Sequence, residues 1–339
     1  MTYIFTKTER NNLKASVFET KSLLYLAANT KKYADITVLT VDCFNDVAGM
    51  CDKENLWDVQ SKGEKNLTPL KIGTYLITLY ENYTSKFSPF FQEFVFFMPR
   101  LHERYLENTS LKNYGISNFK ENQRIKVLEG LRSKANLDGN VELNNFLEKV
   151  LFVEDRSKES TYIKGIMKFK SSNIKGDDFY TAIFKEIRDK QTALKNSDIE
   201  NIEIKRPNEV LGLKRHLTSQ DLQVFVLNRL VGGDVFSTRK SLPSSYAVFT
   251  RYIDEDDIED HVFERNAELS RAFFDKNNQK YFWRLFAAIF DSLSKERSKK
   301  VLDVIGEIDT SLIQKTEHMS VDSIKFLVAI IKDGLISEN

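Results

Sequence analysis

The chain has 339 residues, of which 41% are hydrophobic and 29% are charged, and its 50 Lys and Arg residues are balanced by 49 Asp and Glu residues. This composition is ordinary for a folded protein and excludes a disordered chain, a collagen-like repeat and a disulfide scaffold. The formal charge of +1 excludes a uniformly basic nucleic-acid coat protein but leaves room for a local basic groove. At about 150 residues per domain, the length predicts two domains or three small ones.

Signals for zinc binding, secretion and membrane insertion are weak. Cys43 and Cys51 are too far apart in sequence for a paired zinc-ligand motif, and the four histidines are scattered. The first ten residues lack the long apolar core of a signal peptide. No uncharged stretch approaches the ~20 residues that span a bilayer. We therefore expect a cytoplasmic protein without a membrane segment.

The N-terminal third predicts a helix followed by three strands. Apolar residues at helical spacing predict the helix over residues 8–30. The β-rich run 35–44, the short apolar run 46–51 and the segment 56–62 predict the three strands. The polar turn 52–55 joins the second strand to the third, which predicts a hairpin.

A second helix and a fourth strand follow. Thr68 suits the N-cap of this helix and Pro69 suits its first position. The run 90–98 is apolar on both faces, as expected for a central strand covered by two layers. After residue 99 the pattern becomes helical, apart from residues 141–153, which fit either a helix or a strand.

Polar stretches predict two domain boundaries, one near 105–115 and one near 195–207. The expected fold is α+β, with an N-terminal domain over residues 1–110. A helical middle domain is expected over residues 111–205. A helical C-terminal domain over residues 206–339 is expected to contact a partner or a second copy of the chain.

Polar residues gather on one face of the strand predicted at 56–62. Because side chains alternate along a strand, Asp58, Gln60 and Lys62 share that face. A hairpin with the preceding strand would bring Asp46 toward Gln60 and Lys62. Carboxylate and amide oxygens suit a hard cation such as Mg²⁺, and a lysine beside it can orient water and stabilise charge on a phosphate. The cluster therefore predicts metal-assisted hydrolysis of a phosphodiester.

These elements and residues resemble a known nuclease superfamily. The order of helix, three strands, helix and strand, with Asp46 followed by Asp58-Val-Gln-Ser-Lys62, resembles the PD-(D/E)xK nucleases. More narrowly, Asn45-Asp-Val47 and Val59-Gln-Ser-Lys62 resemble the double-stranded DNA endonuclease domain of CD-NTase-associated anti-phage effectors. The resemblance covers about residues 8–100. Glutamine in place of the second acidic residue departs from the superfamily's commonest pattern.

The resemblance implies a deoxyribonuclease that depends on Mg²⁺ or Mn²⁺ and serves a bacterial anti-phage complex. It implies that Asp46 and Gln60 hold the metal, with Asp58 as a further ligand or a supporting residue. Lys62 would position water and stabilise charge. Glu19 on the first helix is a further acidic candidate, because a helix acid sometimes completes the site in this superfamily. For each of these residues, an ordinary structural role is the alternative.

The resemblance also implies partners. Double-stranded DNA is the expected substrate, and Lys65 and Lys71 are expected to contact its phosphates. The near-neutral net charge argues against tight unassisted DNA binding, so we expect an SMC-like ATPase, a HerA-type translocase or a homo-oligomer to supply grip. Three alternatives stay open: a catalytically silent nuclease fold acting as a scaffold, a wholly helical regulatory protein, and an RNA substrate.

Overall fold

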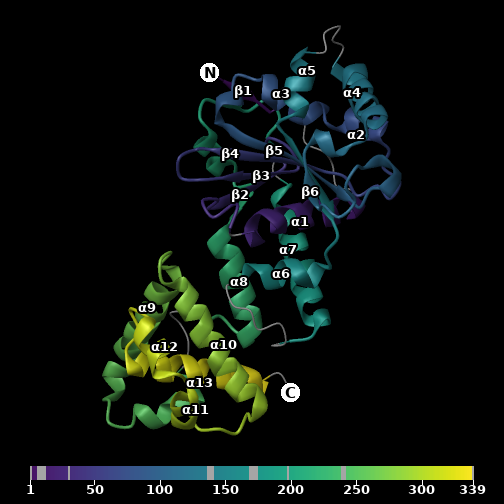
Figure 1. Ribbon diagram of the computed structural model, residues 1–339. Helices are drawn as coiled ribbons and strands as arrows, with labels where there is room; N and C mark the ends of the chain where they lie inside the picture. The colour runs from purple at the N-terminus through teal and green to yellow at the C-terminus, as the bar shows by residue number, and fades with distance from the viewer. Residues whose placement is uncertain are drawn as a thin grey trace. The chain divides into compact units, whose positions relative to one another are not determined.

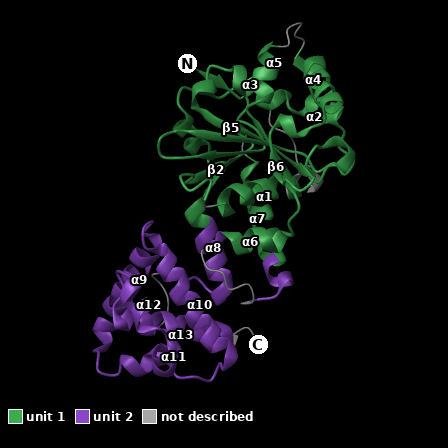
Figure 2. Cartoon of the chain, in the orientation of Figure 1, with its two compact units in different colours: residues 1–165, 181–221 green, residues 166–180, 222–339 purple. Residues whose placement is uncertain are grey.

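The computed structural model gives the chain as two compact units, which Figure 2 distinguishes by colour. Unit 1 comprises residues 1–165 and 181–221, and unit 2 comprises residues 166–180 and 222–339. The structure describes residues 2–5, 13–29, 31–135, 141–167, 175–196, 198–237 and 242–337.

A seven-stranded mixed sheet lies at the centre of unit 1 (Figure 1). In chain order, its strands are β2 (Val38–Val41), β3 (Val47–Met50), β4 (Leu56–Ser61), β5 (Phe91–Pro99), β6 (Asn113–Tyr114), β7 (Val150–Asp155) and β9 (His216–Thr218). Their order across the sheet is β6-β7-β5-β4-β3-β2-β9. β2, β3 and β4 form an antiparallel meander, whereas β4 pairs in parallel with β5, and β5 with β7. A separate two-stranded sheet pairs β1 (Tyr3–Ile4) with β8 (Glu203–Ile204).

Helices cover both faces of the large sheet (Figure 1). On one face, α1 (Leu13–Ala28) packs against β3, β4 and β5, and its Phe18 and Tyr25 contact Phe97 of β5. α6 (Glu159–Ile166) and α7 (Asp177–Leu194) lie on the same side as α1. The opposite face carries α2 (Pro69–Tyr75), α3 (Ile77–Thr84), α4 (Glu121–Ala135) and α5 (Val141–Leu147).

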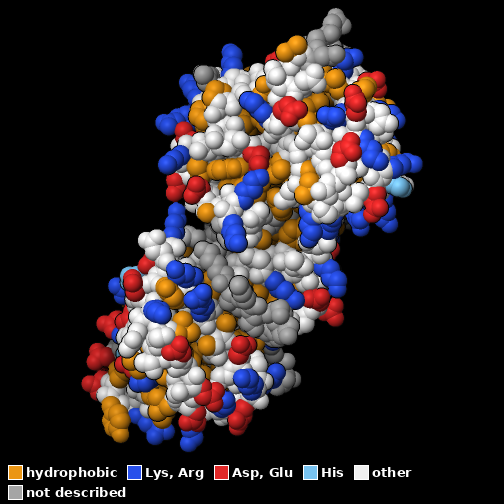
Figure 3. Space-filling model, in the orientation of Figure 1, with side chains coloured by type: hydrophobic (Ala, Val, Ile, Leu, Met, Phe, Trp, Pro, Cys, Tyr) orange, Lys and Arg blue, Asp and Glu red, His pale blue; other side chains and the backbone are white. Residues whose placement is uncertain are grey.

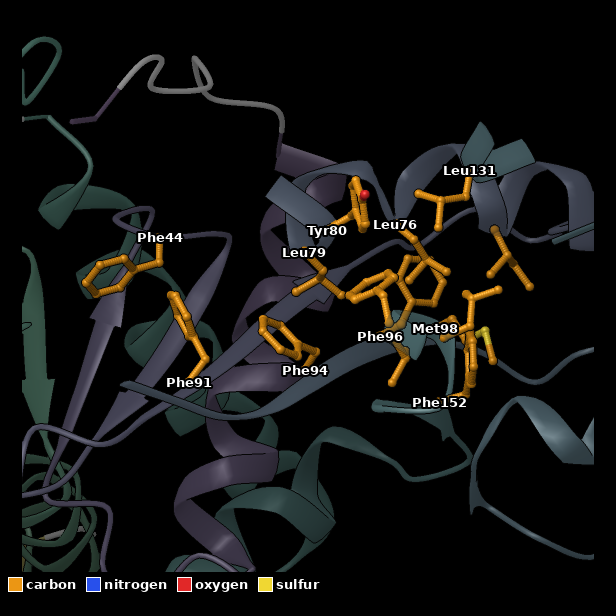
Figure 4. Packing of buried hydrophobic residues seen from close by; sticks show 14 of the residues in the cluster. Phe44, Leu76, Leu79, Tyr80, Phe91, Phe94, Phe96, Met98, Leu131 and Phe152 are labelled. Atoms are coloured by element: carbon orange, nitrogen blue, oxygen red, sulfur yellow. The ribbon is translucent and has the colours of Figure 1, made fainter. Parts of the chain in front are cut away.

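The main hydrophobic core of unit 1 lies between β5 and the helices α2 to α5 (Figure 4). Phe94, Phe96 and Met98 alternate along β5 and are buried beneath these helices. The intervening residues of the strand face α1, so both faces are apolar. This double coverage explains why residues 94–98 are all apolar and buried, and it agrees with the central strand predicted over residues 90–98.

The start of α2 agrees with its predicted capping residues. The backbone N–H of Lys71 donates to the Thr68 hydroxyl at 3.4 Å, and Pro69 occupies the first helical turn. The helix is interrupted at Leu76, after which α3 continues. The ambiguous segment 141–153 contains both alternatives, because the helix α5 is followed directly by β7.

The α+β class is confirmed, but the units differ from the three-part division expected at residues 110 and 205. β7 lies beyond residue 110, yet it pairs in parallel with β5. β9 lies beyond residue 205, yet it pairs with β2 at the other edge. The sheet therefore joins segments that the expected division separates, and the part expected as a helical middle domain contributes strands to it.

Unit 2 is helical in the part that the structure describes. α10 (Gln279–Lys295) contributes Trp283, Phe286 and Phe290, which are buried. A Cβ at Gly334 would lie 1.7 Å from the carbonyl oxygen of Val231, so glycine permits the close crossing of two helices there. No helix among the described residues is both long and apolar enough to cross a membrane. The helices are α8 (Ser219–Val231), α9 (Ile258–Phe274), α10 (Gln279–Lys295), α11 (Val301–Glu307), α12 (Thr310–Lys315) and α13 (Val321–Ser337).

Candidate functional site

The register of the β3–β4 hairpin brings Asp46 to Gln60, as the sequence predicts. Val47 pairs with Val59, so the residue before β3 lies beside the residue after Val59. Gln60 Nε2 donates to Asp46 Oδ2 at 2.8 Å. The backbone N–H and the hydroxyl of Ser61 donate to the same oxygen at 2.7 and 2.8 Å. Among the described residues, no donor reaches the second oxygen, Oδ1, which leaves it free to bind another group.

Gln60 is held from its other side by α3. The hydroxyl of Thr78 donates to Gln60 Oε1 at 2.7 Å, so both ends of the amide are bonded. To present its oxygen beside Asp46, this amide would have to rotate by half a turn. The rotation conserves the contact with Thr78, because a hydroxyl can accept from Nε2 as well as donate to Oε1.

Lys62 lies one residue beyond β4 and is half-buried. Its backbone N–H donates to the carbonyl oxygen of Phe97 at 2.9 Å, which continues the parallel pairing with β5. Its ammonium lies 5.3 Å from the centre of the Tyr75 ring on α2. Gln60 contacts α3 and Lys62 contacts α2, so the two side chains share one face of the sheet, as the alternation along the strand predicts.

Asp58 shares that face but is turned into a buried network. It is fully buried, and its Oδ2 accepts from Asn45 at 2.6 Å and from Asn82 at 2.7 Å. Asn82 also accepts from the Tyr3 hydroxyl at 2.9 Å. The remaining oxygen of Asp58, Oδ1, is buried without a hydrogen-bond partner. Because Asn45 precedes Asp46, this network fixes the turn that carries Asp46.

Glu19 of α1 lies on the other side of the sheet, close to the end of β4. A Cβ at Gly63 would lie 2.6 Å from the Phe18 ring, so the glycine permits α1 to approach the chain just after the strand. Glu19 is 3% exposed and forms an ion pair with Lys195, which directly follows α7. α1 contacts β3, β4 and β5, so Glu19 lies near the sheet.

Burial raises the pKa of three carboxylates in this region, those of Glu19, Asp46 and Asp58. It raises the pKa of Glu19 to about 7, although the Lys195 charge lowers it, and the charge of Asp46 raises it further. Burial raises the pKa of Asp46 as well, against the charge of Lys62 and the bonds from Ser61. These mutual shifts place Glu19, Asp46, Lys62 and Lys195 within one electrostatic neighbourhood.

The two expected phosphate contacts, Lys65 and Lys71, are both exposed. The Lys71 ammonium forms an ion pair with Glu64, which raises the pKa of that ammonium. Lys65 follows Lys62 by three residues on the loop that leads to α2. Both lysines are therefore accessible, and one contact of the Lys71 ammonium is taken up by Glu64.

The donor set of the site suits a hard divalent cation. Asp46 Oδ1 is free, Gln60 can offer an amide oxygen after rotation, and Glu19 can offer a second carboxylate. Oxygen ligands of these kinds are those that Mg²⁺ and Mn²⁺ bind. Asp58 faces Asn45 and Asn82 instead, so it fits a supporting role better than direct ligation.

One group of three His, Cys, Asp or Glu side chains in the described residues has ligand atoms within 4.8 Å of one another, and it lies in unit 2. It consists of Asp275, Glu317 and His318, and His318 Nε2 lies 3.0 Å from Asp275 Oδ2. Glu317 and His318 are exposed. The carboxylates of Glu19, Asp46 and Asp58 do not form so tight a group.

The chain matched no protein-family model, no curated protein and no solved structure in comparisons with known proteins.

The sequence interpretation did not include Lys195, Thr78 or Asn82. Thr78 and Asn82 are four residues apart on α3, the spacing that puts two side chains on one helix face. That spacing, together with the Thr68 cap, is a signal that would have placed both toward β4. Lys195 carries no such signal, because it meets Glu19 across 176 residues of sequence.

Proposed function

We propose that unit 1 is a metal-dependent DNA endonuclease of the PD-(D/E)xK type. The αβββαβ core of that superfamily requires a helix, an antiparallel meander, a helix and a strand. Here α1 is followed by the meander β2-β3-β4, by α2 and α3, and by β5 parallel to β4. α1 and α2 lie on opposite faces of the sheet. This agreement of order, strand direction and helix placement supports the assignment.

The observation that carries the proposal is the contact of Asp46 with Gln60 at the carboxyl end of β4. It places a carboxylate and an amide side by side, with Lys62 two residues further along the chain. Glu19 approaches the same end of β4 from α1. Asp46, Gln60 and Lys62 thus lie together where the strand ends, and Glu19 lies on the α1 side of the same strand end. Oxygen-bearing side chains beside a lysine support a hydrolytic metal site.

In the proposed reaction, Asp46 Oδ1, the Gln60 amide oxygen and Glu19 would hold one Mg²⁺ or Mn²⁺ ion. When bound, the ion supplies Lewis-acid polarisation of a phosphoryl oxygen and lowers the pKa of a bound water. Lys62 would orient the attacking water and stabilise negative charge on the phosphate. Asp58 would hold the turn of Asp46 in place through Asn45.

We place this activity in the cytoplasm, in an effector of a bacterial anti-phage complex that cuts double-stranded DNA. The net charge is only +1, and on the face shown in Figure 3 basic and acidic side chains are interspersed. Non-specific DNA affinity comes mainly from phosphate neutralisation, so this surface favours weak binding by a single chain. An SMC-like ATPase, a HerA-type translocase or a second copy of the chain would therefore supply the additional DNA affinity. That partner would bind unit 2.

Plasmid cleavage tests the activity. Purified protein would be incubated with supercoiled plasmid in Mg²⁺, in Mn²⁺ and in EDTA, beside Asp46→Ala and Lys62→Ala. Lys53→Ala is the matched control, because Lys53 is an exposed lysine in the turn of the same hairpin. We expect cleavage that requires the metal, is lost in both site variants and is retained in Lys53→Ala.

Cleavage of RNA in place of DNA in the same assay would keep the site and change the substrate. Metal-independent cleavage, or full activity of folded Lys62→Ala, would overturn the proposed mechanism. Calorimetric titration with Mn²⁺ distinguishes an enzyme that awaits its partner from an inactive fold, because only the enzyme binds the metal through Asp46.

A second candidate function is a catalytically silent scaffold, and one observation favours it. The polar groups of the site satisfy one another without a metal: Gln60 bonds Asp46, and Lys195 bonds Glu19. Asp46 is only 8% exposed and Gln60 only 4%. A folded protein that binds no Mn²⁺ and whose biological activity survives Lys62→Ala would support this function.

A further inference from the structure

Lys195 is a largely enclosed lysine whose ammonium is paired with Glu19, a carboxylate of the candidate site. Its side chain is 9% exposed and that of its partner, Glu19, is 4% exposed. Burying two charges is costly, and their mutual attraction offsets this cost only when the geometry is well defined. A lysine held in this way differs from a surface lysine, whose ion pairs contribute little.

Two anchors fix the position of Lys195. Four residues before it, Gln191 of α7 accepts a hydrogen bond from the Thr20 hydroxyl of α1 at 2.7 Å, and both side chains are buried. On the other side, Arg215 donates from Nη2 to the carbonyl oxygen of Lys195 at 2.8 Å. Arg215 is itself 1% exposed. The backbone of Lys195 is therefore held on the α1 face of the sheet, independently of the ion pair.

Lys195 and Lys62 both act on Asp46. Each of their charges lowers the pKa of the Asp46 carboxyl, with Lys62 the stronger of the two. Lys62 belongs to the strand end and Lys195 to the segment after α7, so the two cations come from opposite faces of the sheet. A phosphate bound at Asp46 through a metal would lie within the field of both.

We propose that Lys195 is a second substrate-contacting cation of this site. In the metal-free protein it neutralises Glu19. When the Glu19 carboxylate ligates the metal, the Lys195 ammonium is released from it and donates to a phosphate oxygen of the DNA. This inference rests on the proposed nuclease function. It adds a phosphate contact by Lys195 and a competition between Lys195 and the metal for the Glu19 carboxylate.

Two binding measurements test the inference without relying on cleavage. The first is calorimetric titration with Mn²⁺ in the absence of DNA. Lys195→Met removes the competitor for Glu19, so Mn²⁺ should bind about tenfold more tightly than to the wild type. Lys185→Met, an exposed lysine of α7, should leave the metal affinity unchanged.

The second measurement is the salt dependence of binding to a DNA duplex, followed by fluorescence anisotropy in Ca²⁺. Because Lys195→Met leaves Glu19 buried and unpaired, it can fail to fold. Glu19→Gln and the double variant Glu19→Gln/Lys195→Met avoid an unpaired buried carboxylate. The comparison of these two variants therefore decides the question. Loss of one phosphate contact lowers the slope of log K against log salt by about 0.9, so the double variant should show that reduction relative to Glu19→Gln.

Equal salt slopes for Glu19→Gln and the double variant would overturn the inference, since a purely structural ion pair does not change the number of phosphate contacts. Unchanged Mn²⁺ affinity in folded Lys195→Met would overturn the competition with Glu19. If the wild type binds no Mn²⁺ and no DNA, the proposed function itself fails. These results are distinguishable, because the first two leave wild-type metal binding and cleavage intact.

Discussion

The side-chain amide of Gln60 donates to the carboxylate of Asp46 at 2.8 Å across the β3–β4 hairpin. This bond presents the nitrogen of Gln60, not its oxygen, to the position where a metal would bind. The arrangement is stable without a cation, because the donor neutralises part of the buried Asp46 charge. Metal binding therefore exchanges this hydrogen bond for two oxygen ligands. Substitution of either Asp46 or Gln60 should change the balance between the metal-free and the metal-bound protein.

Replacement of Gln60 by Glu should shift that balance toward the metal. The variant loses the donor to Asp46 and puts two carboxylates side by side, so we expect a metal-free protein destabilised by about 1–3 kcal/mol. Mn²⁺ should restore the loss, because it binds the two carboxylates more strongly than a carboxylate and an amide. Thermal unfolding with and without Mn²⁺ measures both effects.

Gln92→Glu is the control for this prediction, since Gln92 lies exposed on β5 and bonds only Asn55 among the described residues. It should leave the unfolding temperature independent of Mn²⁺. A Gln60→Glu variant as stable as the wild type in EDTA, or one that Mn²⁺ does not stabilise, would contradict a metal site at Asp46.

Thr78→Val tests whether the hydroxyl of Thr78 holds the Gln60 amide. Valine is similar in size to threonine but cannot bond Gln60 Oε1, which would be left buried without a donor. Such a loss costs about 1–3 kcal/mol of unfolding free energy. The same change should weaken Mn²⁺ binding, because the rotated amide would also lose its partner. Urea unfolding and calorimetric titration measure the two quantities, and an unchanged metal affinity would show that Gln60 is not a ligand.

The central strands and the Asp46–Gln60 contact follow from local sequence patterns. The turn at 52–55 fixes the hairpin, and alternation along β4 fixes the faces of Gln60 and Lys62. Both signals act over fewer than twenty residues. These signals do not predict how deeply each side chain is buried. Alternation places Asp58 on the same face as Gln60 but does not reveal that Asn45 and Asn82 enclose it.

The remaining parts of the site depend on contacts between distant segments. Lys195 reaches Glu19 because α7 returns to α1, and β9 joins the sheet beside β2. No periodicity within either segment encodes these partners. Likewise, the apolar pattern of residues 141–153 fits a helix or a strand, and only pairing with β5 makes its last part the strand β7.

Asp58 should make stability depend on pH. Burial raises its pKa to about 7 from an ordinary value of 3.8. Between these values the folded protein keeps a proton that the unfolded chain releases, so the free energy of unfolding falls as the pH rises and is constant above about 7. At about 1.4 kcal/mol per pH unit for one proton, the total is on the order of a few kcal/mol.

Asp58→Asn should therefore flatten this fall between pH 4 and 7. Part of the slope will persist, because burial raises the pKa of Glu19 to about 7 as well. Urea unfolding at several pH values measures the slope, and Asp35→Asn is the control, since Asp35 is exposed. An Asp58→Asn variant with the wild-type slope would show that Asp58 titrates at its ordinary pKa despite its burial.

Gly73→Ala should destabilise the packing of α2 against α4. These helices support α3, so the change should also affect the site. A Cβ at Gly73 would lie 2.0 Å from the carbonyl oxygen of Val127 and 2.7 Å from the backbone nitrogen of Leu131, both on α4. Because backbone atoms cannot move aside as a flexible side chain does, α2 and α4 would have to separate. Overpacking of this kind typically costs about 1–3 kcal/mol.

A helix would ordinarily gain from the same substitution, since alanine is favoured over glycine by about 1 kcal/mol. The sign of the measured change therefore decides between close helix packing and simple helix propensity. Gly212→Ala is the matched control, because a Cβ there meets no atom within 4 Å. Urea unfolding should show a clear loss for Gly73→Ala and little change for Gly212→Ala, and a stabilised Gly73→Ala would refute the close crossing of α2 and α4.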